Sequence, residues 1–223
     1  MAQIITKSYT RNTFSELVSD LQSAYNWHNV NIAEDGTYAI FYVTDSIYIR
    51  IEALATDSYI SVRIYKDNDG SVTSTKGQGY ICTRILKTPT AFCFAFTIQT
   101  TNTNISPATS LNNIVIGTAV NQVTGVEETA LAYIVTSSSS ASGYILSSDN
   151  LTEPVSSTPL PFYNNNLGSK VTSIQNVFSK YSECIMKDVY ILSALQFPSL
   201  SYNNCTLNNK KYYMNGIILL ADD

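Results

Sequence analysis

Apolar residues recur at helical spacing near the start of the chain and at every second position over much of the remainder. Within residues 13–26, one helical face collects Phe14, Leu17, Val18, Leu21, Ala24 and Tyr25. Thr13 and Glu16 have the Thr-x-x-Glu spacing of a capping box, in which each side chain bonds the other residue's backbone. The pattern therefore predicts an amphipathic helix that begins at Thr13 and packs one face on another element.

The alternation of apolar and polar residues after this helix indicates β-strands. Strands are predicted over 37–43, 46–54, 58–66, 79–87, 91–98, 113–120, 130–136, 188–195, 204–207 and 211–220. The strand over 91–98 has phenylalanine on one face and only small residues on the other, which predicts burial on both sides. We expect a mainly β fold of antiparallel sheets, sandwich-like, with the N-terminal helix packed on the sheet.

Turn residues separate the predicted strands. Asp67–Gly70, Thr124-Gly125 and Asn208-Asn209 are predicted turns, the last because asparagine tolerates a positive φ. The serine run 137–140 and the following residues to Gly143 are predicted to form a loop. Residues 170–182 fit a helix by spacing and a strand by their content of Val, Thr and Ile, so both assignments remain open.

The domain organisation follows from these segments and from one shift in composition. Residues 1–146 are predicted to form a domain of one helix and β-sheet. Residues 147–169 are rich in Ser, Pro and Asn, which is typical of a loop or linker. Residues 170–223 are predicted to form a C-terminal helix or hairpin segment within the same globular unit.

Charge is scarce in this chain. Asp, Glu, Lys and Arg make up 13% of the 223 residues, against about 25% in an ordinary soluble protein. The polarity comes instead from 27 Ser, 24 Thr, 20 Asn and 16 Tyr. A net charge of −4 without a basic stripe argues against a nucleic-acid partner, and no apolar run reaches the length of a membrane span. A normal apolar share of 44% excludes an intrinsically disordered chain.

Catalytic and metal-binding patterns are absent from the sequence, so no catalytic, cofactor-binding or metal residues are predicted and no cofactor is expected. His28 is the single histidine and has no neighbouring nucleophile motif. Cys82, Cys93, Cys184 and Cys205 form no Cys-x-x-Cys pair, which favours free thiols over a zinc site or a disulfide. The segment Asp67–Gly70 begins like a calcium loop but lacks the glutamate that would complete it.

An acid-pair hydrolase remains one alternative, because glycoside hydrolysis needs two carboxyl groups facing a cleft. The candidate acids are Asp45, Glu52, Asp57, Glu127 and Glu128. Nothing in their spacing selects one pair, so we expect the protein not to be an enzyme.

Tyrosines alternate with apolar residues on several predicted strands, which places them on outward faces. Tyrosine provides a large contact area at low entropic cost and is enriched at interfaces. The candidate interface residues are Tyr48, Tyr59, Tyr65, Tyr212 and Tyr213. A face of this kind suits either contact with another subunit or binding of a sugar.

The layout resembles that of virion proteins of tailed bacteriophages and prophages. The resemblance is carried by the opening helix, the two strands that follow it, an aromatic middle strand and a closing hairpin: Thr10–Trp27, Tyr38–Val43, Ile47–Ile51, Ala91–Phe96, Asp188–Ile191 and Leu207–Gly216. It covers most of the chain in layout and about forty residues in detail, and residues 137–170 depart from it.

The resemblance implies a structural component of a tailed phage or phage-tail-like virion, in the tail or head–tail region. Its partners would be other virion proteins and sister copies in a symmetric homo-oligomer, held through sheet edges and tyrosine-rich faces. The alternative is a receptor- or glycan-binding module of a tail fibre or baseplate, with a host-surface glycan as partner. The N-terminus has no secretion-signal pattern, so we expect synthesis in the host cytoplasm and a final location in the virion.

Overall fold

The chain begins with a strand, a short 3₁₀ turn and a helix. The computed structural model describes residues 2–25, 30–53, 59–66, 71–78, 80–99, 111–121, 123–136, 141–147, 153–155, 173–178, 184–193, 204–207, 209–215 and 218–222. Strand β1 (Gln3–Tyr9) is followed by a 3₁₀ turn, η1 (Arg11–Thr13), and by helix α1 (Phe14–Tyr25). The predicted helix is confirmed, whereas β1 was not expected from the sequence.

The start of the helix differs from the predicted capping box. The backbone N–H of Thr10 donates to Thr13 Oγ1 at 2.9 Å, so Thr13 closes the turn before the helix rather than capping it. Glu16 accepts a hydrogen bond from Lys7 Nζ at 2.7 Å instead. The pairing of Thr13 with Glu16 was wrong because β1 brings a cation to Glu16 that helical spacing could not reveal.

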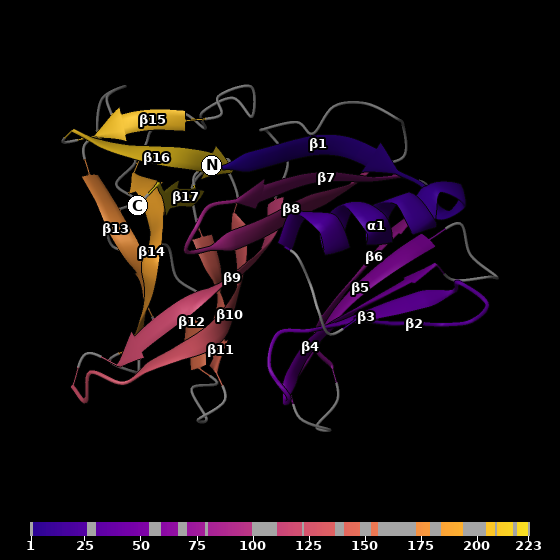
Figure 1. Ribbon diagram of the computed structural model, residues 1–223, viewed down its shortest axis with the longest axis horizontal. Helices are drawn as coiled ribbons and strands as arrows, with labels where there is room; N and C mark the ends of the chain where they lie inside the picture. Colours follow the sequence, from indigo (N-terminus) through magenta and orange to yellow (C-terminus); the bar gives the residue numbers. More distant parts are fainter. Residues whose placement is uncertain are drawn as a thin grey trace.

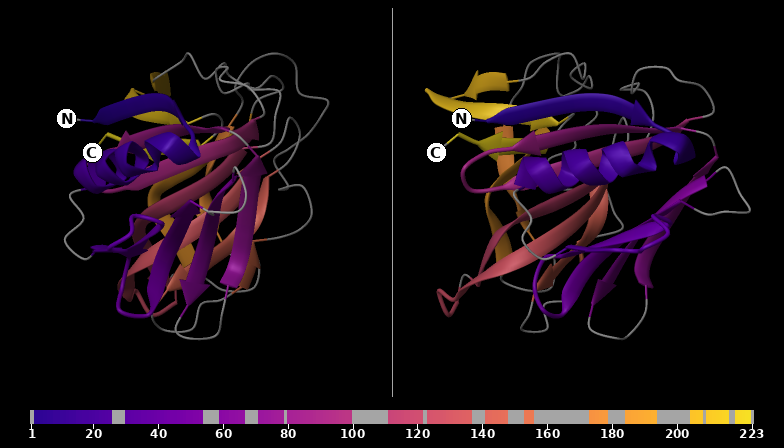
Figure 2. Two further views of the ribbon diagram at one scale, coloured as in Figure 1. Left: turned by 90° about the vertical axis from the view of Figure 1, so that its right-hand side faces the viewer. Right: turned by 45° about the vertical axis from the view of Figure 1, so that its right-hand side comes forward.

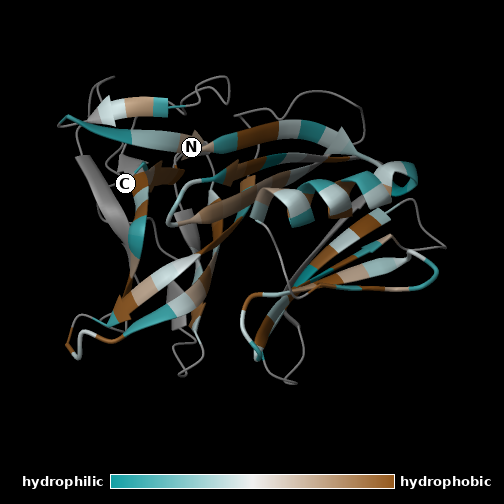
Figure 3. Cartoon of the chain, viewed as in Figure 1, coloured by the Kyte–Doolittle hydropathy of each residue, from teal (hydrophilic) through white to brown (hydrophobic). Residues whose placement is uncertain are grey.

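Five strands next in sequence form the smaller sheet, in the order β2-β3-β4-β5-β6. They are β2 (Val30–Ile32), β3 (Tyr38–Tyr42), β4 (Ile47–Ala53), β5 (Tyr59–Lys66) and β6 (Ser71–Gln78). All neighbours pair antiparallel. Along β4 the burial alternates strictly, with Ile47, Ile49 and Ile51 inside. Figure 3 shows the same alternation as brown and paler segments along these strands.

The remaining strands join β1 in a twelve-stranded antiparallel sheet. Its first half contains β7 (Tyr80–Lys87), β8 (Phe92–Gln99), β9 (Leu111–Asn121), β10 (Glu127–Thr136), β11 (Ala141–Ser147) and β12 (Glu153–Val155). Its second half contains β13 (Ser173–Phe178), β14 (Cys184–Ser193), β15 (Asn204–Leu207), β16 (Lys210–Asn215) and β17 (Ile218–Ala221). The expected mainly β, sandwich-like class with one N-terminal helix is confirmed (Figure 1).

Strand β9 is the branch point of the large sheet. It pairs with β10 along one edge, and along the other it pairs first with β8 and then with β14. The last partner from β8 is Phe92, opposite Ile116, and the first from β14 is Met186, opposite Ala119. Between these two pairs, no described strand pairs with this edge of Gly117-Thr118.

One core lies between the two sheets and the helix. A small interior gap, with no room for a water molecule, lies where the helix and the two sheets meet. It is lined by Leu21 of α1, Phe41 and Ile49 of the small sheet, and Phe92 and Phe94 of β8. The helix runs alongside β1 and β7 and lies between them and the small sheet (Figure 2). Burial of this apolar surface is the main favourable term for holding the sheets together.

A second core lies on the opposite face of β8, β9 and β10. Cys93, Val115 and Ala132 of those strands are buried together with Val189 of β14 and Leu219 of β17. Strand β8 is therefore buried on both sides, as its sequence predicts. The C-terminal strands belong to the same sheet as β9, so strands that precede and strands that follow the Ser/Pro/Asn-rich segment 147–169 in the sequence form one sheet.

Two of the predicted turns are confirmed, and part of one predicted loop is wrong. Gly125 and Asn209 have φ of 72° and 62°, which confirms the predicted turns at these positions. The predicted loop to Gly143 is wrong for 141–143, because β11 begins at Ala141 and pairs with β10. The ambiguous stretch 170–182 contains strand β13. The predicted turn at Asp67–Gly70 and the serine run 137–140 lie outside the described residues.

Within the described part of the chain, no helix has both the length and the apolar character that crossing a membrane requires.

Candidate functional site

The outer face of the small sheet gathers most of the predicted interface residues. We call it the tyrosine face: Tyr38, Ile40, Tyr42, Tyr48, Arg50, Glu52, Tyr59, Arg63 and Tyr65. These residues alternate with the buried positions of β3, β4 and β5. All of them are half-buried, because large neighbouring side chains cover one another on a face that the other described elements leave uncovered.

Three tyrosines form a row across this face. Tyr42 is paired with Tyr48, and Tyr48 is paired with Tyr65, in the registers of β3, β4 and β5. The rings of Tyr48 and Tyr65 stack with their centroids 4.9 Å apart and an angle of 9° between planes. The Tyr42 ring lies 5.5 Å from that of Tyr48, tilted by 45°. Adjacent strands thus hold the row in place through cross-strand contacts.

A charged cluster lies beside this row. Arg50 donates to Glu52 Oε1 at 2.6 Å, and Arg63 lies 3.7 Å from Glu52 Oε2. The Arg50 guanidinium also lies over the Tyr38 ring, 4.3 Å from its centroid. A hydrogen bond with Tyr65 is the main cause that raises the pKa of Arg63, followed by the charge of Glu52. The cluster therefore presents two guanidinium groups and one carboxylate within an aromatic surface.

The five predicted interface tyrosines do not form one surface. Tyr48 and Tyr65 stack on the tyrosine face, and Tyr59 lies on the same face of β5. Tyr213 lies on β16 of the other sheet. The exposure expected for Tyr212 is wrong: it is 4% exposed and its ring packs edge-on against Tyr190. Adjacent residues of a strand point to opposite faces, so Tyr212 and Tyr213 cannot both point outward.

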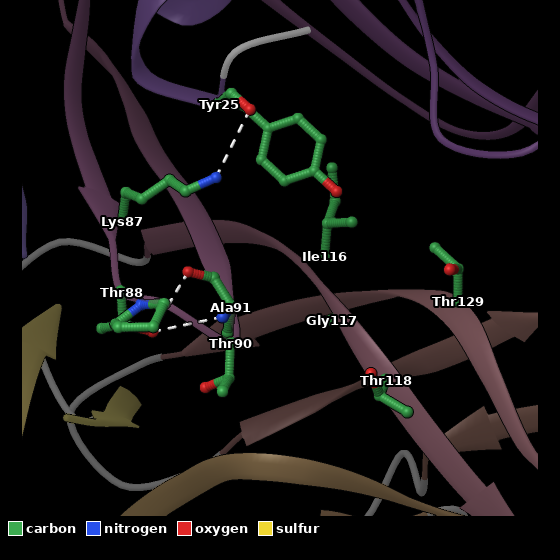
Figure 4. A pocket seen from close by; sticks show the side chains of 10 residues that line it. Tyr25, Lys87, Thr88, Thr90, Ala91, Ile116, Gly117, Thr118 and Thr129 are labelled. Atoms are coloured by element: carbon green, nitrogen blue, oxygen red, sulfur yellow. Dashed lines mark hydrogen bonds between the residues drawn. The ribbon is translucent and has the colours of Figure 1, made fainter. Parts of the chain in front are cut away.

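A groove lies at the end of α1, away from the candidate residues predicted from the sequence. We call it the threonine groove: Tyr25, Lys87, Thr88, Pro89, Thr90, Ala91, Ile116, Gly117, Thr118 and Thr129 (Figure 4). Its volume is about 370 Å³. The last helical residue, the β7–β8 turn, and paired positions of β9 and β10 surround it. Threonines separated along the sequence gave no signal for this site, because only strand pairing brings them together.

Lys87 stands at the edge of the threonine groove beneath the helix end. Its Nζ donates to the Tyr25 carbonyl oxygen at 3.4 Å and lies 4.4 Å from the centre of the Tyr25 ring. A cation at the C-terminal end of a helix is favourable because the last carbonyls carry partial negative charge. Burial lowers the pKa of Lys87 and raises that of Tyr25.

The residues considered for enzymatic chemistry are dispersed. Glu52 bonds to Arg50 on the small sheet, whereas Glu127 pairs with Lys187 at 3.1 Å beside the large sheet. Among the described residues, no group of three His, Cys, Asp or Glu could hold a metal ion. Within the described part of the chain, neither Cys93 nor Cys205 takes part in a disulfide. His28 and Asp57 lie outside the described residues.

Comparisons of the chain with protein-family models, with curated proteins and with solved structures gave no match.

Proposed function

We propose that the protein is a non-enzymatic structural subunit that associates with copies of itself through the tyrosine face. The observation that carries the proposal is the row of Tyr42, Tyr48 and Tyr65 on the outer face of the small sheet. The strands already fix these rings against one another, so little side-chain entropy remains to be lost on association. Aromatic residues and arginine are the types enriched in the cores of protein interfaces.

The charges of this face favour a second copy as the partner. Glu52 lies between Arg50 and Arg63 of its own chain, so the cluster carries both signs and a net charge of only one, and two copies related by a twofold axis can cover it without opposing large like charges. A partner of strongly basic or strongly acidic character would meet like charge on part of the surface. The low charge of the whole chain also limits the desolvation cost of covering its surface.

The test replaces one tyrosine at the centre of the row. Tyr48→Lys introduces a third cation beside the two arginines, so two opposed faces would repel one another. We expect the unchanged protein to form a symmetric oligomer, and the variant to dissociate with a dissociation constant raised at least about tenfold. Multi-angle light scattering across a dilution series, supported by native mass spectrometry, measures both.

Tyr213→Lys is the matched control because it makes the same exchange on another sheet. We expect it to keep the oligomer, and both variants to keep the circular dichroism spectrum of the unchanged protein. A monomeric unchanged protein at high micromolar concentration, or a Tyr48→Lys oligomer as tight as the control, would contradict the proposal. A monomer that binds a neutral glycan through the tyrosine face would support the receptor-binding alternative.

We further propose, from the sequence resemblance, that this oligomer is part of a tailed-phage or phage-tail-like virion. Particles purified from the source cells should then contain the chain in a fixed ratio to the other particle proteins. Quantitative peptide mass spectrometry of density-gradient fractions measures this ratio, with a cytoplasmic host enzyme as the control for contamination. If the chain is found only outside particle fractions, the virion assignment fails while the assembly proposal stands on its own test.

A further inference from the structure

The ammonium of Lys87 has hydrogen-bonding capacity left over inside the threonine groove. An ammonium carries three N–H donors, and the described structure gives this one a single acceptor, the Tyr25 carbonyl oxygen at 3.4 Å. No carboxylate among the described residues pairs with it, and Lys87 is the only charged residue of the groove lining. A partly desolvated cation of this kind gains from a counter-ion.

Hydroxyl groups lie around the same space. Thr90, Thr118 and Thr129 line the groove; Thr90 and Thr129 are exposed and Thr118 is half-buried, so a ligand in the groove can reach them. Thr118 and Thr129 are directly paired across β9 and β10, which puts two hydroxyls side by side on the strand side of the groove. Figure 4 shows Lys87 pointing to Tyr25 at the helix end, Thr118 and Thr129 on the strands, and Thr90 on the turn next to Ala91. A hydroxyl both donates and accepts, so this side suits a ligand that carries hydroxyls itself.

The backbone adds further polar groups. Along β9, the pairing with β8 ends at Ile116 and the pairing with β14 begins at Ala119, so Gly117-Thr118 lies between the two. The turn facing it is held by its own contacts: the Thr88 hydroxyl accepts from the Ala91 N–H at 3.1 Å and donates to the Ala91 carbonyl at 3.2 Å. The groove is therefore formed before any ligand arrives, which reduces the entropy lost on binding.

We propose that the threonine groove binds a small molecule with one carboxylate and several hydroxyls, in the manner of a sugar acid. The Lys87 ammonium pairs with the carboxylate, and the threonine hydroxyls bond to those of the ligand. A single ammonium matches one negative charge, whereas a phosphate dianion would keep one charge unmatched. The volume of about 370 Å³ lies at the lower end of the range for small-molecule sites, which fits a single sugar ring.

This site is separate from the tyrosine face, so it does not depend on the proposed assembly. The test uses the full-length protein with D-glucuronate as the probe, and with D-glucose, inorganic phosphate and acetate as comparison ligands. Amide chemical shifts of the labelled protein report where each ligand binds, and isothermal titration gives its affinity. We expect glucuronate to shift the amides of Thr90, Ala91, Gly117 and Thr118, and to bind more tightly than each comparison ligand.

Two substitutions separate the roles of charge and hydroxyl. Lys87→Gln removes the ammonium but keeps an N–H donor for the Tyr25 carbonyl, and should weaken glucuronate binding at least about tenfold. Lys87→Arg should retain most of the affinity. Thr118→Val removes one hydroxyl at nearly constant shape and should weaken glucuronate without changing acetate binding.

Lys211→Gln is the matched control, because Lys211 Nζ also lies over a tyrosine ring, 4.8 Å from the centre of Tyr213, but outside the groove. It should leave glucuronate binding unchanged. The proposal is overturned if glucuronate does not bind, if glucose or phosphate binds as tightly, or if Lys87→Gln and Lys211→Gln give the same affinity. Equal melting temperatures of the two variants exclude loss of folding as the cause of a difference.

Discussion

Tyr9 shows how a single hydroxyl connects the first strand to the helix. The side chain is fully buried, and its hydroxyl donates to Asp20 Oδ2 at 2.6 Å. Lys7, two residues earlier on β1, pairs with Glu16 at 2.7 Å and lies 3.4 Å from the same Asp20 oxygen. A strand and a helix that are adjacent in sequence are thus joined by a small polar network at the edge of the first core.

Tyr9→Phe should lower the free energy of unfolding by about 1 kcal/mol at pH 7, because one hydrogen bond to a carboxylate is lost. The substitution should also change how the free energy of unfolding depends on pH above about pH 10. Burial, and then the hydrogen bond to Asp20, raise the pKa of Tyr9 far above its ordinary value. Above about pH 10 the unfolded chain releases a proton that the folded protein keeps, so stability falls as pH rises.

Urea unfolding between pH 8 and 11 measures this effect. The unchanged protein should lose stability more steeply than the Phe variant, by up to about 1.4 kcal/mol per pH unit above pH 10. The raised pKa values of Tyr25 and Tyr48 are common to both proteins and cancel in the comparison. Parallel curves above pH 10 would show that Tyr9 keeps no proton on folding.

Residue-level prediction succeeded where a pattern repeats and failed where one position must be judged alone. The alternation along β4 correctly placed Tyr48 on the outward face of its strand. Tyr212 and Tyr213 are adjacent, and composition alone could not tell which of them points to the second core. The threonines of the groove were missed because their proximity arises from the pairing of β9 with β10.

At the scale of elements, the strands with regular apolar alternation were predicted, whereas the polar strand β6 and the start of β11 were not. Strand β6 reads Ser-Val-Thr-Ser-Thr-Lys-Gly-Gln and has little apolar content, yet it pairs with β5 along its length. Strand β11 begins within a serine-rich segment whose composition predicts a loop as far as Gly143. Backbone hydrogen bonding to a neighbour defines such strands, and a single sequence does not reveal the neighbour.

The β10–β11 hairpin depends on a residue without a side chain. A Cβ on Gly143 would overlap the Tyr133 carbonyl oxygen, and would lie 2.8 Å from the carbonyl carbon and 3.0 Å from Ile134 Cα. Since the obstacle is backbone in a paired strand, it cannot move without breaking the pairing. Gly143→Ala should therefore destabilise the protein by about 3 kcal/mol in urea unfolding.

Gly117→Ala is the control for this substitution. Its added Cβ would make ordinary contacts, 3.6 Å from Ala91 Cβ and from Met186 Cε. We expect a change of less than about 1 kcal/mol. Equal effects at both positions would mean that overlap with the Tyr133 backbone does not set the cost.

At the scale of the whole molecule, strands of the N-terminal and C-terminal parts share the large sheet and the second core. Val115, Ala132 and Ile145 of the first part are buried together with Val189 and Leu220 of the second. A fragment of residues 1–146 would expose this apolar face to water. Large exposed apolar patches promote aggregation.

The fragment 1–146 should therefore fail to fold into a stable soluble unit. We expect low soluble yield, strong binding of an apolar dye such as ANS, and a non-cooperative thermal transition. The full-length protein prepared in parallel is the control. A fragment that melts cooperatively and binds no dye would instead make 147–169 a true linker between independent domains.

The branch at β9 sets an order of events during synthesis. Ala119 pairs with Met186, so part of the β9 edge has no strand partner until roughly 70 more residues have left the ribosome, several seconds at about 5–20 residues per second. An unpaired strand edge is a template for pairing with other chains. Nascent chains on neighbouring ribosomes of one mRNA lie close together, and each would expose the unpaired edge of β9. Slow translation of the C-terminal third should therefore increase aggregation of the nascent protein, even though the completed sheet conceals the edge.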